Sequence, residues 1–383
     1  MVDLISGLKP LGVKAMVIFP EKGDLSLRLE ELGIPSAQLP FANCVQWRSA
    51  FPKWHPRRLV SIAANSVRST YKRFANPAQT AQLSEVCQEF KADAIVTNTV
   101  AINTGLSVSK RLGLPHVWHI REFGDKDWDF YPDFGLGARR RQMQESALLV
   151  FVSNAVKKHH LQQCRLSDSG KYKVIYNAIA TRAEIERRLS IDYANHSRHG
   201  VVFGFSGYVK YSKGQFDAVH AFKLACEQGL RGKLVFAGEG ANRELQSLVD
   251  ELGMRHLVEI RGHLPQREME GFYRSIDCGL MCSVSEGFGR TTAEYMSWGK
   301  PVLGRDGGAT PEIVRDGLNG YLYDGSIESL AKTMSRIASC EVTRLQLGSA
   351  AGRFALENFV SEKASSEFLS ALKAQDLPTA HPG

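Results

Sequence analysis

The stretch "DCGLMCSVSEGFGRTTAEYMSWGKPVLGRD", residues 277–306, holds an apolar run, a glycine-rich turn, a helical pattern and a second apolar run. The first run, 277–283, predicts a buried strand, and the helical pattern ends at Gly299 before Pro301 opens the next strand. A helix between two such strands returns the chain to the same end of a sheet, so the strands run parallel. The stretch therefore predicts an α/β fold.

The same alternation extends in both directions along the chain. Further apolar runs lie between helical patterns at 13–19, 93–98, 115–120, 147–153, 172–177, 200–207, 233–240, 256–262, 300–306 and 320–324. The polar segment 180–199 interrupts this rhythm and predicts an interdomain connection with a short helix. The 383 residues suit two doubly wound domains. We expect them at 1–180 and 181–355. The last helical pattern covers roughly 342–373, and we expect its C-terminal part, about 356–375, to pack back onto the first domain.

The composition excludes several classes of protein. Hydrophobic residues make up 43% and charged residues 23% of the chain, which is the balance of a globular protein. No run of about 18 apolar residues predicts a membrane span, and the first residues lack the features of a secretion signal. The seven cysteines are odd in number and widely scattered. They argue against a disulfide framework and for a reducing, cytoplasmic location.

No pattern in the sequence predicts a metal site. Cys278 and Cys282 fall on one apolar strand, and no second pair completes a zinc site. We interpret "KKHH", 157–160, as a solvated helix face, because adjacent helical residues point in different directions. We interpret "DKD", 125–127, as a surface loop. No metal and no other cofactor is therefore expected.

The formal net charge of +8 is concentrated in one segment. Residues 41–84 contain no Asp or Glu, and their basic side chains are Arg48, Lys53, Arg57, Arg58, Arg68, Lys72 and Arg73. An apolar stripe through Val60, Val67 and Phe74 predicts an amphipathic helix there. Two interpretations remain open: a helix on an anionic membrane surface, at the inner face of the membrane, and a helix that covers the first sheet with a solvated basic face.

Two glutamates flank the glycine-rich turn, at positions 286 and 294. Ligands of doubly wound sheets bind beyond the carboxyl ends of the strands, and Glu286 follows such an end. Gly287 and Gly289 let the backbone approach a ligand, and the N–H groups at the helix start near Arg290 form an anion site suited to phosphate. Glu286 then suits sugar hydroxyls and Glu294 suits ribose hydroxyls. The alternative is that both are helix-start charges favoured by the macrodipole.

The block from Ser285 to Tyr323 resembles the signature of glycosyltransferase family 4, whose members are retaining GT-B enzymes that use sugar nucleotides. Glu286 and Glu294 match its Glu-x7-Glu pattern. Three earlier segments resemble other blocks of that family: "FSGYVKYSKG" (205–214), "FAGEG" (236–240) and "RGHLP" (261–265). The similarity covers most of residues 90–375 and implies two Rossmann-like domains that face a cleft.

The resemblance implies roles for residues of the second domain. Lys213 would reach the diphosphate and Glu286 would hold hydroxyls of the donor sugar. Tyr208 stands where the family often has an arginine, and Lys210 or Arg290 is a candidate to replace that cation. The resemblance also places Gly207 beside the diphosphate, Arg261 and Gly262 beside the base, Phe288 and Gly289 on sugar or phosphate oxygens, and Glu294 on the ribose.

In the first domain, "HVWHIREFGD", 116–125, resembles a segment found in a subset of the family. The resemblance makes His119 a candidate catalytic residue that contacts the reacting sugar or the acceptor. Arg121 and Glu122 would bind the acceptor or hold the loop. A histidine packed within the strand is the alternative interpretation of His119.

The chain begins differently from the pattern of the family. Family members usually start with a strand and a glycine turn, whereas the first element predicted here is a helix, "VDLISGL", before the strand at 13–19. We expect the first domain to lack that first strand. We also expect a longer reading frame to add about 15–30 residues, the length of one strand and a turn.

The expected function is a retaining, metal-independent transfer of a sugar from a nucleoside diphosphate sugar to a glycan or lipid-linked acceptor, in polysaccharide synthesis at the cell surface. A catalytically weak sugar-nucleotide-binding protein and a sugar-nucleotide epimerase of the same fold are the alternatives. No G-x-G-x-x-G follows a first strand, which disfavours a nicotinamide-dependent dehydrogenase. No nucleic acid partner is expected.

Overall fold

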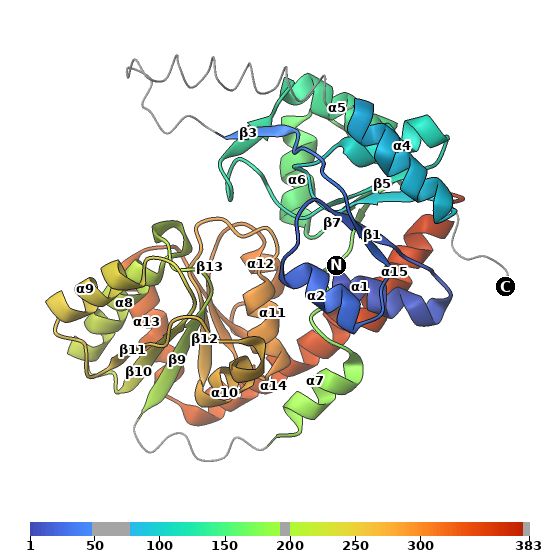
Figure 1. Ribbon diagram of the computed structural model, residues 1–383. Coiled ribbons are helices and arrows are strands. Elements are labelled where there is room, and N and C mark those ends of the chain that lie inside the picture. The colour runs from blue at the N-terminus through green and yellow to red at the C-terminus, as the bar shows by residue number, and fades with distance from the viewer. Residues whose placement is uncertain (48–76, 192–199, 378–383) are drawn as a thin grey trace, which may run out of the picture. The chain divides into compact units, whose positions relative to one another are not determined.

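The structure, a computed structural model, describes residues 1–47, 77–191 and 200–377. The predicted amphipathic helix of the basic segment lies outside these residues. The chain divides into two compact units (Figure 1). The first contains Met1–Tyr176 and the residues from Ala364 onward, and the second contains Asn177–Lys363.

The second unit is built on a six-stranded sheet in which every neighbouring pair is parallel. Its strands are β9 (Val201–Ser206), β10 (Gly232–Ala237), β11 (Val258–Ile260), β12 (Cys278–Met281), β13 (Val302–Arg305) and β14 (Gly320–Tyr323). Their order is β11-β10-β9-β12-β13-β14. This is the doubly wound order of dinucleotide-binding folds, and the strand order reverses between β9 and β12. Ligands of such sheets bind at that point.

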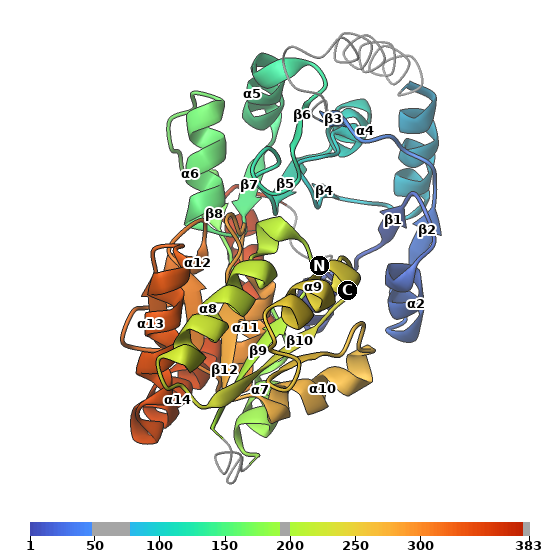
Figure 2. The same cartoon turned by 90° about the vertical axis from the view of Figure 1, so that its left-hand side faces the viewer.

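Helices cover both faces of this sheet (Figure 2). They are α8 (Gln215–Glu227), α9 (Asn242–Glu251), α10 (Gln266–Ser275), α11 (Arg290–Ser297), α12 (Thr310–Ile313), α13 (Ile327–Ala338) and α14 (Glu341–Asn358). Helix α8 packs against α13, and α11 packs against α14. The core between α8 and the sheet includes Phe203, Phe222 and Phe236, all fully buried. Burial of these large side chains is the main force that holds the layers together.

The described residues of the first unit form three separate sheets rather than one. Strands β4 (Ile95–Thr97), β5 (His116–Ile120), β7 (Leu148–Phe151) and β8 (Tyr172–Val174) form a parallel sheet. Strands β1 (Val17–Phe19) and β2 (Ser36–Gln38) form a parallel pair, and β3 (Val45–Trp47) pairs antiparallel with β6 (Phe130–Pro132). The sequence analysis missed β2, β3 and β6, because each spans only three residues and lacks a continuous apolar run.

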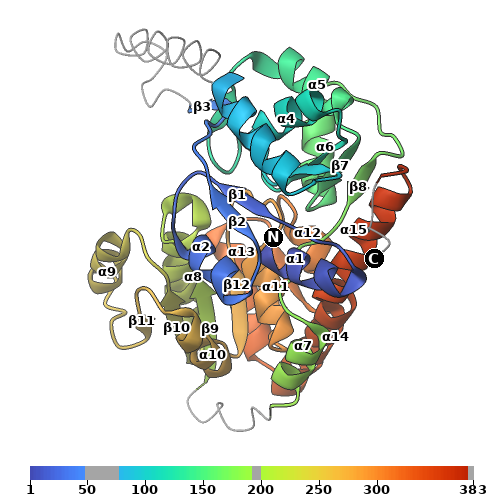
Figure 3. The same cartoon turned by 45° about the vertical axis from the view of Figure 1, so that its right-hand side comes forward.

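Helices of the first unit surround these sheets. They are α1 (Val2–Leu8), the 3-10 turn η1 (Lys9–Leu11), α2 (Asp24–Glu31), the helical residues 77–89, α4 (Thr104–Leu112), α5 (Gly135–Glu145), α6 (Asn154–Gln163) and most of α15 (Ser361–Lys373). The first element is a helix and β1 follows it, in the order expected. Helix α15 lies beside α1, because Ser365 Oγ donates a hydrogen bond to Leu4 O at 3.1 Å (Figure 3).

The chain crosses between the units twice, and these segments pair with each other. The Ile179 N–H donates to Phe359 O, and the Ser361 N–H donates to Ala180 O. This short bridge separates α14 from α15, so the single helical pattern predicted near the C-terminus is two helices. The connection also contains α7 (Arg182–Leu189), where Thr181 and Glu184 form a capping box.

Among the described residues, no helix has both the length and the apolar character that crossing a membrane requires.

Candidate functional site

The turn between β12 and α11 lies where the strand order of the second unit reverses. Gly289 has φ +84° and serves as the N-cap of α11, which begins at Arg290. A left-handed backbone at this position favours glycine. The first N–H groups of α11 have no acceptors within their own helix, and the helix dipole places positive charge there. The geometry suits an anion beside the turn.

A second glycine turn holds the first one in place. The Ala309 N–H donates to Glu286 O at 2.8 Å. Gly308 has φ +57°, and a Cβ at this position would lie 2.6 Å from Glu286 O. Only glycine permits this approach, so the turn after β13 fixes the backbone of Glu286.

The loop after β9 brings Lys213 to the same place. Lys213 ends the 3-10 turn η3 (Tyr211–Lys213), and a Cβ on Gly214 would lie 2.6 Å from Cys282 O. The loop therefore packs closely on the end of β12. Lys213 Nζ lies 2.8 Å from Glu286 Oε2, and the side chains are 35% and 18% exposed. The two candidate catalytic residues of this unit are joined in an ion pair.

A cavity of about 310 Å³ lies beside α11, and Gly207, Tyr208, Glu239, His263, Tyr273 and Glu294 are among its lining residues. Gly207 has φ +135° and follows β9. Its neighbour Ser206 is fixed on the side of the core, because the Ser206 N–H donates to the hydroxyl of the fully buried Tyr295 at 2.6 Å. The cavity is therefore bounded by the ends of neighbouring strands and by α11.

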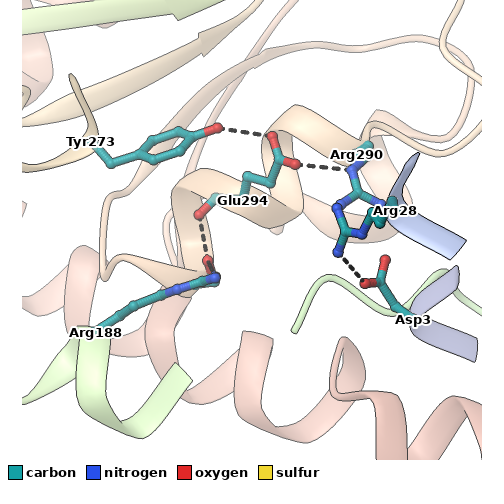
Figure 4. A network of polar contacts seen from close by, with 7 residues as sticks. Asp3, Arg28, Arg188, Tyr273, Arg290 and Glu294 are labelled. Atoms are coloured by element: carbon teal, nitrogen blue, oxygen red, sulfur yellow. Dashed lines mark hydrogen bonds and ion pairs between the residues drawn. The ribbon is translucent and has the colours of Figure 1, made fainter. Parts of the chain in front are cut away.

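Glu294 of α11 lines this cavity, and among the described residues two side chains donate hydrogen bonds to its carboxylate. Tyr273 Oη donates to Glu294 Oε2 at 2.8 Å, and Arg290 Nε donates to Glu294 Oε1 at 2.9 Å (Figure 4). The Asp3–Arg28 pair drawn in the same view belongs to the first unit. Arg290, a candidate to replace the missing phosphate cation, is thus bound to the carboxylate in this structure.

The other residues predicted to bind the donor sugar nucleotide differ in their surroundings. The Arg261 side chain pairs with Glu259 at 2.9 Å, and it is not among the residues that line the cavity. Gly262 has φ +67° and accepts a hydrogen bond from the Gly238 N–H. The Phe288 ring is buried against Phe359, with ring centroids 5.7 Å apart, so its side chain anchors the turn.

His119 of the first unit is buried in β5 and only 5% exposed. Burial, with a smaller effect of Arg121, lowers the pKa of His119 well below its ordinary value, so the ring is neutral. Within the described part of the chain, Nε2 of His119 is buried and has no hydrogen-bond partner. An atom of this kind is uncommon in a packed interior and favours a contact with a ligand.

Asn98, which the sequence analysis did not single out, shares this property. Thr97 pairs with Trp118 in the register of β4 and β5, and Asn98 and His119 are the residues that directly follow this pair. Asn98 Oδ1 is also buried without a partner among the residues described. No sequence pattern distinguishes Asn98, because its relation to His119 depends on the register.

Glu122 holds the loop that follows β5. Its carboxylate accepts hydrogen bonds from the Thr99 hydroxyl and from the Val100 N–H, the latter at 2.7 Å. Burial raises the pKa of Glu122, an effect that these two hydrogen bonds oppose. These contacts hold the loop, which is one of the two roles predicted for Glu122.

The "KKHH" segment is not a solvated face as predicted. His160 is buried, and its Nε2 lies 2.9 Å from Glu122 O. His159 Nε2 lies 2.7 Å from Asp125 Oδ1, so α6 anchors the "DKD" loop. The helical period alone could not show that the loop after β5 folds over this face. Across the described ranges, no group of three acidic, histidine or cysteine residues is arranged to hold a metal ion.

Family models match both halves of the chain. Residues 194–354 match "Glycosyl transferases group 1", and residues 1–183 match "Glycosyltransferase Family 4". The chain belongs to glycosyltransferase family 4. Among curated members, an uncharacterized glycosyltransferase of Methanocaldococcus jannaschii is 30% identical over 206 residues, 51% of this chain and 52% of that protein. A trehalose synthase of Pyrococcus horikoshii is 27% identical over 172 residues, 42% of this chain and 41% of that protein.

The chain spans about half the length of these curated relatives, or less. Similarity to solved structures extends over nearly the whole chain. HepE of Anabaena, in complex with UDP and glucose, has TM-score 0.72 at 20% identity, covering 97% of this chain and 95% of HepE. A glycosyltransferase of Rickettsia africae has TM-score 0.74 at 16% identity, covering 97% and 93%. At these identities the likeness establishes the GT-B fold.

Proposed function

We propose that this family 4 protein transfers a sugar from a nucleoside diphosphate sugar to a glycan or lipid-linked acceptor. The observation that carries the proposal is the arrangement around α11, where Lys213 and Glu286 lie at the mouth of the helix and Glu294 lines the adjoining cavity. A sugar, a diphosphate and a ribose would then follow one another from Glu286 to Glu294. The UDP and glucose bound to HepE, which shares the fold, support a donor of this class.

The proposed chemistry follows from the charges at the turn. Breaking the bond to the leaving diphosphate places negative charge on that group, and Lys213 and the N–H groups of α11 are positioned to stabilise it. With positive charge supplied in this way, we propose a reaction that does not depend on a metal. We assign no protein nucleophile. The reaction would retain the configuration of the sugar by attack and departure on one face.

His119 is the proposed contact of the first unit to the reacting sugar or the acceptor. Its Nε2 is buried without a hydrogen-bond partner in the described ranges, which supports this role. Arg121 remains a proposed acceptor contact. The proposed location is cytoplasmic, at the inner face of the membrane, if the basic segment binds anionic lipid. Flotation with anionic vesicles at low salt tests this last point, and the absence of binding would refute it. Polysaccharide synthesis is the proposed context.

Release of nucleoside diphosphate tests the proposed reaction. We expect the protein to release it from at least one of UDP-glucose, UDP-galactose, UDP-N-acetylglucosamine and GDP-mannose, faster with a glycan or lipid acceptor and unchanged by EDTA. Glu286→Gln should abolish the release. Binding without release would favour the alternative of a weak sugar-nucleotide-binding protein, which Tyr208 at the position of an expected cation suggests. Loss of release in EDTA would refute metal independence.

A further inference from the structure

Glu294 is held by two side chains that differ in rigidity. Arg290 reaches Oε1 from one turn earlier on α11, and its side chain is 44% exposed. Tyr273 reaches Oε2 from α10, and Tyr273 is only 6% exposed. An exposed ion pair contributes little and is screened by salt, whereas a hydrogen bond from a buried hydroxyl to a carboxylate is stronger. Tyr273 is therefore the more rigid of the two contacts.

The ring of Tyr273 is fixed from several sides. It stacks on Trp298 with ring centroids 5.8 Å apart and meets Tyr295 edge-on at 5.9 Å. The Arg188 guanidinium covers the Trp298 ring at 5.3 Å and donates to Ser297 Oγ. Burial and the nearby Glu294 raise the pKa of Tyr273, so its hydroxyl stays protonated and donates to the carboxylate.

The contacts with Tyr273 and Arg290 define how many further hydrogen bonds the carboxylate of Glu294 can accept. Each carboxylate oxygen has two lone-pair directions, and Tyr273 and Arg290 each use one of them. One acceptor position therefore remains on each oxygen, and both lie in a plane that Tyr273 fixes. Two acceptors side by side match two adjacent hydroxyl groups, as in the diol of a ribose. Glu294 and Tyr273 line the same cavity.

We propose that Tyr273 is a positioning residue: its hydroxyl orients the Glu294 carboxylate so that both oxygens accept from the adjacent hydroxyls of a ribonucleotide. This inference rests on the proposed function, because it takes the ligand to be a nucleoside diphosphate. Without Tyr273, the carboxylate is held by Arg290 alone and samples other rotamers, which costs entropy on binding. The protein should then lose its preference for ribonucleotides over deoxyribonucleotides, since a site built for hydroxyls rejects ligands without them.

The test compares Tyr273→Phe with the unaltered protein by titration calorimetry. The probes are UDP, GDP or ADP, whichever raises the melting temperature most, and the 2′-deoxy and 3′-deoxy forms of that nucleotide. We expect the unaltered protein to bind the ribonucleotide about tenfold more tightly than either deoxy form. In Tyr273→Phe the ribonucleotide should bind about tenfold more weakly, and the difference between the three probes should nearly vanish. Phenylalanine keeps the stacking on Trp298, and a melting curve verifies that the variant folds.

Tyr295→Phe is the matched control, because its hydroxyl contacts Ser206 rather than Glu294. This variant should weaken all three probes alike and keep the preference for the ribonucleotide. The inference is overturned if Tyr273→Phe discriminates between ribose and deoxyribose as the unaltered protein does. Failure of the unaltered protein to bind any nucleoside diphosphate would instead overturn the proposed function, and with it this inference.

Discussion

Lys213 Nζ lies 2.8 Å from Glu286 Oε2, although 73 positions separate the two residues in the chain. The loop after β9 and the turn after β12 bring them together at the point where the strand order of the sheet reverses. In the proposed reaction, this ammonium group turns to the leaving diphosphate while the carboxylate accepts hydroxyls of the donor sugar. The ion pair therefore keeps both groups in place before the donor arrives.

Replacement of Lys213 tests this role. We expect Lys213→Ala to lower kcat/KM by about 10²–10³, the loss that follows removal of one group that stabilises developing negative charge. Lys223→Ala is a suitable control, because Lys223 forms an ion pair on α8 with Glu227 and lies on no surface assigned to the donor. Steady-state release of nucleoside diphosphate measures both variants. Equal activity of Lys213→Ala and the unaltered protein would remove Lys213 from the mechanism.

The close contact between the turn after β13 and the backbone of Glu286 predicts that Gly308 affects turnover. Gly308→Ala places a methyl group 2.6 Å from Glu286 O at a left-handed φ, so the turn must move. We expect kcat to fall at least tenfold. Gly317→Ala is the matched control, because Gly317 has φ +72° but a Cβ there meets nothing within 4 Å. Both variants should lose about 1 kcal/mol of stability from backbone strain, and only Gly308→Ala should lose turnover. Similar kcat values in the two variants would show that the contact between Gly308 and Glu286 does not matter for turnover.

Nε2 of His119 has no hydrogen-bond partner among the described residues, and this predicts that replacing the ring raises stability while turnover falls. Replacing a buried, unpaired polar group by an apolar one of similar size is neutral or stabilising. We therefore expect His119→Phe to keep or raise the melting temperature while turnover falls about 100-fold. The same combination is expected for Asn98→Leu with a smaller loss of turnover. If His119 is merely packed within the strand, the variant will keep full turnover, and our assignment will be wrong.

Buried neutral histidines predict that the first unit is sensitive to acid. Burial lowers the pKa of His116 to about 4 and that of His160 to about 3, from 6.5. As the pH falls below 6.5, the unfolded chain binds protons that the folded chain does not, so stability decreases with decreasing pH down to about pH 4. Each histidine contributes about 1.4 kcal/mol per pH unit in that window. Urea unfolding between pH 7 and 4.5 measures this slope, and constant or rising stability would contradict it.

The parallel sheets could be predicted from the sequence because their strands are continuous apolar runs buried on both faces. All six strands of the second unit overlap predicted runs. Strands β2, β3 and β6 could not be predicted, because each contains only three residues and none is a continuous apolar run. They are strands because their backbones pair, β2 with β1 and β3 with β6. The break between α14 and α15 was missed for a similar reason. Only the pairing of Val360 with Ala180 shows that the helix must stop there.

The candidate site was predictable where glycines and carboxylates follow a strand, as around Glu286 and Glu294. It was not predictable where a contact depends on how two helices pack. Tyr273 reaches Glu294 only because α10 and α11 lie side by side, and an aromatic residue on an amphipathic helix otherwise indicates a core position. The side chain of Arg261 likewise pairs with Glu259, a contact that its motif did not reveal.

We propose above all that the turn before α11 and the cavity beside this helix bind a nucleoside diphosphate. The most direct test is the melting temperature of the protein with UDP, GDP and ADP, compared with that of Glu294→Ala. A ligand at 100 times its dissociation constant adds about 2.7 kcal/mol of stability, which raises the melting temperature by several degrees. We predict such a rise for at least one nucleotide and its loss in Glu294→Ala. An unchanged melting temperature with all three at millimolar concentration, or an equal rise in Glu294→Ala, would show that no nucleoside diphosphate binds at this site.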